Sequence, residues 1–255
     1  MIRACGVTDP GRVRKTNEDA FVSDPEVRLF AVSDGMGGHQ AGEVASHLAI
    51  DVMTTFIRRS ANDIDFSWPF GIDQTLSMDG NRLRTAIHLA NRRVFRAAES
   101  SDDYTGMGAT VVAVLLNGTC LSIGHVGDSR LYMLADGKLQ QLTVDDSWAT
   151  VLAQDPTLDV DDIAHHPMRN VLTNVLGARD QITVHLSERT ITPGEMLLLC
   201  SDGLHGVLDG DALRDMLLDA PDVEVAAQRL VAAALERGSR DNVTALVVRH
   251  EADKG

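Results

Sequence analysis

Apolar residues recur with helical spacing along three stretches of the chain. The clearest stretch is 43–59, where apolar side chains repeat at i, i+1, i+4 and i+5 and leave charged residues on the opposite face. The same period returns at about 82–99 and at about 222–237, where Gly238 is placed to cap the helix end. The pattern therefore predicts three amphipathic helices.

Short runs rich in β-branched and other apolar residues predict strands. These runs lie at 2–8, 28–33, 109–116, 119–126, 130–135, 182–188, 196–201 and 243–249. The dipeptides Asn117-Gly118 and Asp136-Gly137 favour tight turns, so neighbouring runs should pair as antiparallel hairpins. Because strands and helices are segregated rather than alternating, the pattern predicts an α+β fold and disfavours a doubly wound parallel sheet.

Residues 143–180 break this pattern, because they are acidic and mixed in period. We expect a surface excursion with one or two short helices there. A flap over the functional site and a loop without a role both fit such a segment, and the two interpretations stay open.

Composition and charge narrow the class of protein. With 255 residues, 44% of them hydrophobic, the chain can build one sizeable core but is short for two, so we expect residues 1–255 to form one domain. The net charge of −14 disfavours nucleic acid and anionic membranes as partners. No apolar run approaches the roughly 20 residues of a membrane span, and the first residues lack the apolar centre of a signal peptide. We therefore expect a cytoplasmic protein.

The three cysteines are Cys5, Cys120 and Cys200, and each lies in a strand-like apolar run. An odd number without CxxC spacing argues against a disulfide framework and against a zinc site. We expect all three to be reduced core residues.

Four aspartates lie at the ends of predicted strands. Asp34, Asp128 and Asp202 each close an apolar run, and Asp241 opens the last one. One such aspartate most often serves a turn, but four would converge if the strands share one core. Clustered carboxylates repel one another unless they are protonated or bridged by cations. Since the available ligands are oxygens, Mg2+ or Mn2+ is the chemical match.

Near the N-terminus, Arg14 lies four residues before Glu18. An arginine in such a setting is usually part of a surface ion pair, but its planar guanidinium also suits bidentate recognition of phosphate. This stretch alone leaves both interpretations open.

Six short blocks occur together along nearly the whole chain, from about residue 3 to 249. They are R-x-x-N-E-D-A (14–20), D-G-M-G-G (34–38), G-A-T (108–110), G-D-S-R (127–130), S-D-G-L (201–204) and R-D-N-V-T (240–244). In this order and spacing they resemble the metal-dependent protein phosphatase family, also called protein phosphatase 2C-type, in its bacterial serine/threonine branch.

The resemblance implies a four-layer α-β-β-α sandwich, in which two antiparallel sheets are flanked by helix pairs. It also implies a centre of two Mn2+ or Mg2+ ions, bridged by Asp34 and approached by Glu18 through a metal-bound water. A third, weaker ion would lie between Asp128 and Asp202. The implied metal set is Glu18, Asp34, the Gly35 carbonyl, Asp128, Asp202 and Asp241.

The implied reaction is hydrolysis of phosphoserine and phosphothreonine in proteins by a hydroxide that bridges the two ions, without a phosphoenzyme. Arg14 would bind and neutralise the phosphoryl oxygens. The implied catalytic residues are Asp34, Asp202, Asp241 and Arg14. The implied partners are phosphorylated proteins and a cognate Ser/Thr kinase.

Two positions depart from the family pattern close to the implied centre. Many eukaryotic members carry a histidine after the D-G pair as the proposed acid for the leaving alkoxide, whereas this chain has Met36. His39 is the nearest substitute, and an exposed histidine at a helix start is the competing interpretation. Asp146 stands where bacterial relatives commonly have histidine, so the flap at 143–180 is the least transferable part. His165 and His166 precede Pro167 in a block similar to the family's own.

All implied core ligands are present, which favours an enzyme. The second hypothesis is a metal-binding pseudophosphatase that docks phosphoproteins without turnover. The chain lacks Cys-x5-Arg, G-x-S-x-G and G-x-x-x-x-G-K-[ST], which disfavours a cysteine-based phosphatase, a serine hydrolase and a nucleotide kinase.

Overall fold

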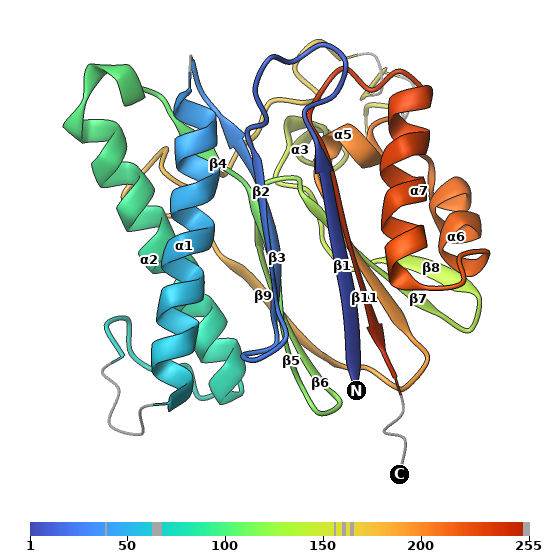
Figure 1. Cartoon of the computed structure of the whole chain (residues 1–255). Helices are drawn as coiled ribbons and strands as arrows, with labels where there is room; N and C mark the ends of the chain where they lie inside the picture. Colours follow the sequence, from blue (N-terminus) through green and yellow to red (C-terminus); the bar gives the residue numbers. More distant parts are fainter. Residues whose placement is uncertain (39, 63–67, 156, 160–161, 164–165, 252–255) are drawn as a thin grey trace.

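The computed structural model describes residues 1–38, 40–62, 68–155, 157–159, 162–163 and 166–251. Two antiparallel β-sheets pack face to face, and a helical layer covers the outer face of each (Figure 1). The α+β class and the four-layer sandwich are therefore confirmed.

The five-stranded sheet has the order β1-β11-β10-β7-β8 and joins the first strand of the chain to the last. The second sheet has the order β2-β3-β5-β6-β9, and the short β4 pairs with β3. The strands of the first sheet are β1 (Ile2–Asp9), β7 (Arg130–Ala135), β8 (Lys138–Gln141), β10 (Met196–Cys200) and β11 (Val243–His250). Those of the second are β2 (Asp19–Asp24), β3 (Leu29–Met36), β4 (Gly108–Ala109), β5 (Val111–Asn117), β6 (Cys120–Val126) and β9 (His185–Thr190).

The helices follow the predicted amphipathic stretches, and the first two extend beyond them. α1 (Ala41–Asn62) and α2 (Met78–Ser100) cover the second sheet, while α7 (Val223–Glu236) packs on β1 and β11. Ser77 and Asp222 cap α2 and α7 through their side chains, and Gly238 has a φ of +84° just past the end of α7, as expected for a C-terminal cap. The short elements are η1 (Asp102–Tyr104), α3 (Trp148–Leu152), α5 (Asp202–His205) and α6 (Gly210–Leu218).

The face between the sheets is an apolar layer built from alternate residues of the strands. Val32 and Val112 of the second sheet face Leu131, Leu199 and Leu246 of the first, and all five are fully buried. Separate apolar clusters fill the space between each sheet and its helices. The polar ends of the strands are left to converge at one rim of the sandwich.

Both predicted hairpins form. β5 pairs with β6, and β7 pairs with β8 across Asp136-Gly137, whose φ values of +50° and +71° match a type I′ turn. β2, β8 and α6 were not among the predicted elements. β9 begins three residues later than the predicted run at 182–188. These elements carry weak periodic signals, because they are short or lie at sheet edges.

Two further expectations about the core need correction. The run at 28–33 does not stop at Asp34, because β3 continues to Met36. Cys200 is buried, but Cys5 is only partly buried and Cys120 is exposed. Cys120 opens β6 beside the hairpin turn, where the side chain is left at the surface. All three cysteines are free thiols, as predicted.

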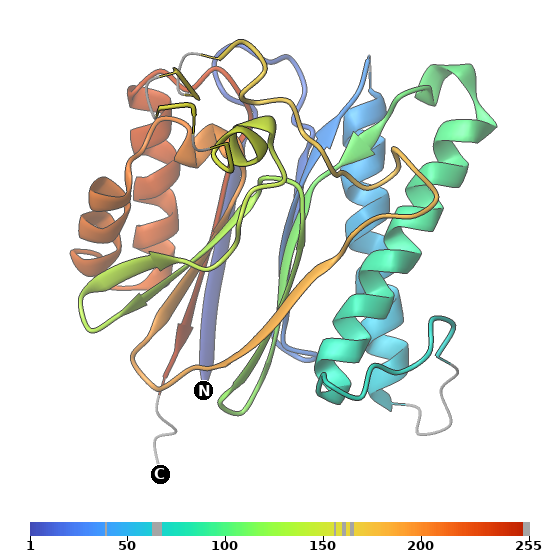
Figure 2. The same ribbon diagram turned by 180° about the vertical axis from the view of Figure 1, so that it is seen from behind.

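The excursion at 143–180 crosses the rim of the sandwich from the first sheet toward α2 before the chain enters β9 (Figure 2). It contains the short helix α3, as the sequence predicts. No helix among the described residues is both long enough and apolar enough to cross a membrane.

The layer between the sheets predicts a specific stability effect. Leu199→Ala should lower the free energy of unfolding by about 2–5 kcal/mol, because the lost side chain leaves a cavity in a fully buried layer. Urea unfolding measures this change. Leu218→Ala, at an exposed position on α6, is the matched control and should change the value by less than about 0.5 kcal/mol.

Candidate metal and phosphate site

The aspartates at the strand ends converge on one cavity of about 200 Å3 at the rim of the sandwich. Both sheets contribute, since Asp34 lies on β3 of the second sheet, whereas Asp202 and Asp241 lie next to β10 and β11 of the first; Asp128 lies in the turn between β6 and β7. All the metal and phosphate residues implied by the sequence line it: Arg14, Glu18, Asp34, Gly35, Asp128, Asp202 and Asp241. The remaining lining residues are Met36, Gly37, Thr110, Asn170 and Leu172.

Asp34 is held by the backbone of β3 and by the turn that precedes β5. Its N–H donates to Thr110 Oγ1 at 3.1 Å, and its carbonyl accepts from Thr110 N at 2.8 Å. The Thr110 hydroxyl is in turn hydrogen-bonded to Ser129 Oγ at 2.7 Å. This turn residue, in the G-A-T block, therefore fixes the direction of Asp34. This supporting role of Thr110 was not predicted from the sequence.

Gly35 lies where no larger residue fits. A Cβ atom there would lie 1.9 Å from the Gly42 carbonyl oxygen and 2.8 Å from that of Glu18. Gly35 N also donates to the Glu18 carbonyl at 3.0 Å. The start of α1 and the loop that carries Glu18 can thus close on β3 only because residue 35 is glycine.

Asn242 anchors the loop that carries Arg14 and Glu18. Its Oδ1 accepts from Glu18 N at 2.8 Å, and its Nδ2 donates to the carbonyls of Pro10 and Thr16, both at 2.9 Å. Asn242 had no role in the sequence analysis, although its place in the R-D-N-V-T block was a usable signal. Its amide ties the first and last segments of the chain together at the cavity.

Arg14 lies at the rim and contacts an acid. Its Nη2 donates to Asp241 Oδ2 at 2.7 Å, while about half of the Arg14 side chain stays exposed. The surface ion pair left open by the sequence is therefore present. The guanidinium nevertheless keeps donors directed at solvent in the mouth of the cavity.

Burial and mutual repulsion perturb the carboxyl groups of this cavity. Burial, followed by repulsion from Asp19, Asp202 and Asp128, raises the pKa of Asp34 well above its ordinary value. Burial and then Asp202 raise the pKa of Asp128 to about 7. The pKa of Asp202 is also raised, by burial and then by Asp241. Without cations, burial and mutual repulsion therefore favour the protonated form of these acids.

Asp19 lies behind the cavity and was missed by the sequence analysis. It pairs with Asp34 across β2 and β3, and its Oδ2 accepts from Ser201 Oγ at 2.7 Å and from Thr244 Oγ1 at 2.6 Å. Its Oδ1 is buried without a partner. Burial raises the pKa of Asp19 to about 7, against the two hydroxyl hydrogen bonds that lower it. Asp19 therefore adds another carboxyl group to the buried cluster.

The donor set fits hard divalent cations. Asp202 Oδ1 is buried without a hydrogen-bond partner, and the lining offers oxygen donors from carboxylates and a backbone carbonyl. Within the described residues, however, no three His, Cys, Asp or Glu side chains are arranged to hold a metal ion by themselves. Ions here would take part of their ligands from the Gly35 carbonyl and from water, which suits Mg2+ and Mn2+ because they retain water readily.

The candidate acids for a leaving group are less well placed. Met36 lines the cavity and has no proton to donate. His39 and His165 lie outside the described residues. His205, which the sequence analysis passed over, binds the Asp128 carbonyl through Nε2 at 3.0 Å, and burial lowers the pKa of its imidazole to about 4. His205 is thus a neutral support for the turn that carries Asp128.

The excursion at 143–180 reaches the cavity through Asn170 and Leu172. The carboxylate of Asp146 holds this excursion in place. Its Oδ2 accepts hydrogen bonds from Gly127 N at 3.0 Å and from Asn174 Nδ2 at 2.7 Å, and its Oδ1 lies 2.8 Å from His185 Nε2. Although it departs from the family pattern, Asp146 joins the excursion to β9 and to the turn before Asp128.

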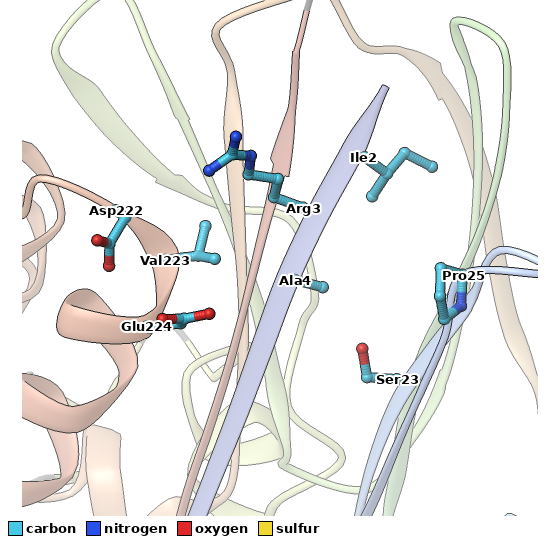
Figure 3. A pocket seen from close by; sticks show the side chains of 8 residues that line it. All are labelled: Ile2, Arg3, Ala4, Ser23, Pro25, Asp222, Val223 and Glu224. Atoms are coloured by element: carbon cyan, nitrogen blue, oxygen red, sulfur yellow. The ribbon is translucent and has the colours of Figure 1, made fainter.

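A larger cavity, of about 410 Å3, lies away from these acids at the free edge of β1 (Figure 3). Arg3, Asp222 and Glu224 lie on one side of the strand, and Ile2 and Ala4 on the other. Two of its charged groups are already engaged, because Arg3 pairs with Glu251 and Asp222 caps α7. The cavity at the strand ends therefore remains the candidate functional site.

A family model described as protein phosphatase 2C matches residues 12–246. The chain belongs to the protein phosphatase 2C family. Among its relatives, "Serine/threonine protein phosphatase PstP" of Mycobacterium tuberculosis is 34% identical over 97% of this chain but only 45% of that protein. "Serine/threonine phosphatase stp" of Listeria welshimeri is 33% identical over 94% of this chain and 93% of that protein.

Solved structures agree with this placement in the protein phosphatase 2C family. A structure of PstP from Mycobacterium tuberculosis superposes with a TM-score of 0.85 over 98% of this chain and 99% of that one, at 34% identity. A structure of the PstP catalytic domain in complex with two manganese ions gives a TM-score of 0.81 at the same identity and coverage.

The buried acids of this phosphatase-family chain predict a pH-dependent stability. The raised pKa values mean that the folded protein binds more protons than the unfolded chain between about pH 4 and pH 7. In EDTA, the free energy of unfolding should therefore lose a contribution as pH rises through that range, and Mn2+ should restore stability at pH 7.5. Urea unfolding at pH 5 and 7.5 measures both effects. Asp128→Asn should show a smaller pH-dependent loss, and an unchanged loss in this variant would contradict the assignment.

The contacts of Asp146 predict a role in holding the excursion. Asp146→Ala removes the acceptor for Gly127 N and Asn174, so limited proteolysis within 143–180 should become at least about threefold faster. Asp180→Ala, an exposed aspartate of the same excursion, is the control. Equal cleavage rates for the two variants would show that Asp146 does not fasten the segment.

Proposed function

We propose that the chain is a protein serine/threonine phosphatase that hydrolyses phosphoserine and phosphothreonine by direct attack of a hydroxide bridging two Mn2+ or Mg2+ ions. The observation that carries this proposal is the convergence of seven implied site residues on one cavity, in a chain of the protein phosphatase 2C family. The relatives named serine/threonine phosphatase and the manganese-bound structure of PstP support it.

In this proposal the two ions supply one kind of chemistry, the lowering of the pKa of a shared water so that it can attack near neutral pH. The residues that would hold the two ions are Asp34, the Gly35 carbonyl, Asp202, Asp241 and, through water, Glu18. Asp128 and Asp202 would hold a third, weaker ion. Their burial and raised pKa values give the metal-free protein a repulsion that cations would relieve.

Arg14 would bind the phosphoryl group of the substrate. Its guanidinium lies at the mouth of the cavity and is oriented by Asp241 at 2.7 Å. A planar fork at that position can meet two phosphoryl oxygens at once and offset the charge that develops on them. Arg14 would thereby direct phosphorus toward the acids.

Direct attack by water is favoured over a serine-, threonine- or cysteine-based phosphoenzyme because the described lining offers no free hydroxyl or thiol. Thr110 is the only hydroxyl-bearing residue of the described lining, and its oxygen is occupied by Ser129 and by Asp34 N. In the proposed step, the hydroxide oxygen bonds to phosphorus and keeps its proton, the bond to the serine or threonine oxygen breaks, and that oxygen takes up a proton from an acid. His39 would be the source of this proton.

The same proposal covers the setting of the enzyme. Phosphorylated proteins would be the substrates, and a cognate Ser/Thr kinase would supply them, in the cytoplasm. Residues 1–255 would act as one catalytic domain, because the acids come from both sheets and the excursion at 143–180 completes the cavity. Because Asn170 and Leu172 line the cavity, the excursion would act as a flap over it.

Metal removal gives the decisive test. With Mn2+, the protein should hydrolyse p-nitrophenyl phosphate, and EDTA or Asp202→Ala should reduce the rate by at least about a hundredfold, since each removes the water-activating charge. Asp103→Ala, at an exposed site on η1, is the control and should keep full activity. Activity that survives EDTA would overturn the proposal. Absent activity with Mn2+ demonstrably bound by calorimetry would favour a pseudophosphatase.

A further inference from the structure

A second surface, the α1–α2 groove, lies on the outer helical layer and shares no residue with the acidic cavity. It has a volume of about 600 Å3 and runs between the two antiparallel helices on the left of Figure 1. Its floor is apolar and consists of Leu48, Val52, Phe56 and Leu89. Phe56 is buried, whereas the other three are only partly covered, so the floor presents apolar surface to solvent.

The rim of the α1–α2 groove is basic. Arg59 extends from α1, and Arg92, Arg93 and Arg96 extend from α2, all four exposed. Asp51 is the single acidic residue of the lining. The two helices together carry seven arginines against four acidic residues, in a chain whose net charge is −14. The groove therefore opposes the charge of the rest of the molecule.

The guanidinium groups of these arginines make few contacts with the rest of the described structure. Within the described part of the chain, Arg59, Arg93 and Arg96 make neither an ion pair nor a hydrogen bond. Arg92 only stacks over the Phe70 ring, 4.6 Å from its centroid. Four guanidinium groups gathered around an apolar floor, with Asp51 as the one carboxylate of the lining, repel one another and gain from an anionic ligand.

The spacing of the lining residues along α1 indicates the length and shape of an anionic ligand that would fit the groove. The α1 side of the groove runs from Leu48 to Arg59 in steps of three and four residues, which is one face of the helix over about 17 Å. An amphipathic helix of about three turns matches this length, with apolar side chains on the floor and carboxylates along the rim. We propose that the α1–α2 groove docks an acidic amphipathic helix of a partner protein, at a distance from the acidic cavity.

Two other ligand classes fit less well. An anionic membrane or a nucleic acid would bring phosphates against the whole of a strongly acidic molecule, and both extend far beyond this groove. An acidic helix places its charge only where the arginines are. A concave apolar floor also suits an inserted side chain better than a flat lipid surface.

The test uses a fluorescein-labelled probe peptide of about twelve residues, a designed helix with leucines on one face and glutamates on its flanks. A second peptide carries lysine at each glutamate position. Fluorescence anisotropy at low salt should show at least about tenfold tighter binding of the glutamate peptide. The double variant Arg93→Glu, Arg96→Glu should bind it at least about tenfold more weakly.

The matched control reverses two exposed charges on strands, Lys138→Glu and Arg189→Glu, and should change binding by less than about twofold. Both double variants should keep the thermal unfolding temperature and the rate of p-nitrophenyl phosphate hydrolysis, so that lost docking is separated from lost folding or catalysis. Hydrogen exchange with the glutamate peptide bound should show protection confined to α1 and α2.

Three results would overturn the proposal. One is equal affinity for the glutamate and lysine peptides, and another is unchanged affinity in the Arg93→Glu, Arg96→Glu variant. The third is tighter binding to phosphatidylserine vesicles or to duplex DNA than to the glutamate peptide, abolished by the same reversal, because the groove would then serve a membrane or a nucleic acid.

Discussion

The repulsion among buried carboxyl groups is the constraint on which this structure depends. Four of these acids lie at the rim where the two sheets meet, namely Asp19, Asp34, Asp128 and Asp202. Burial and repulsion between neighbouring carboxylates raise their pKa values. A chain that served stability alone would place apolar or singly paired residues there. The repulsion is confined to this one place, where clustered carboxylate oxygens with free lone pairs can bind divalent cations.

The rest of the fold holds these acids in place. The apolar layer between the sheets fixes the strand ends relative to one another, and the acids cannot move apart without breaking it. Thr110 directs Asp34, Asn242 anchors the loop of Glu18, and Gly35 lets that loop approach. Ordinary packing and hydrogen bonding thus preorganise a site that is electrostatically unfavourable without cations.

Charge is also segregated over the surface of the molecule. The acidic cavity lies at one rim of the sandwich, whereas the unpaired arginines gather on the outer helices around the α1–α2 groove. The long strands and helices that connect the two regions belong to the same packed layers. A protein of this architecture therefore has room for a docking surface whose ligand never enters the cavity.

The sequence by itself determined the fold class, the three long helices, most strands and the residues of the cavity, because strong periodicity and six ordered blocks carry that information. It misplaced the end of β3, missed β2 and the short β8, and put Cys120 in the core. Only the tertiary structure decided which residues support the acids, as Asp19, Thr110, Asn242 and His205 do. It also brought Leu48 and Arg96, from different helices, into one groove. Such contacts join residues far apart in the chain, so they depend on how layers pack rather than on any local pattern.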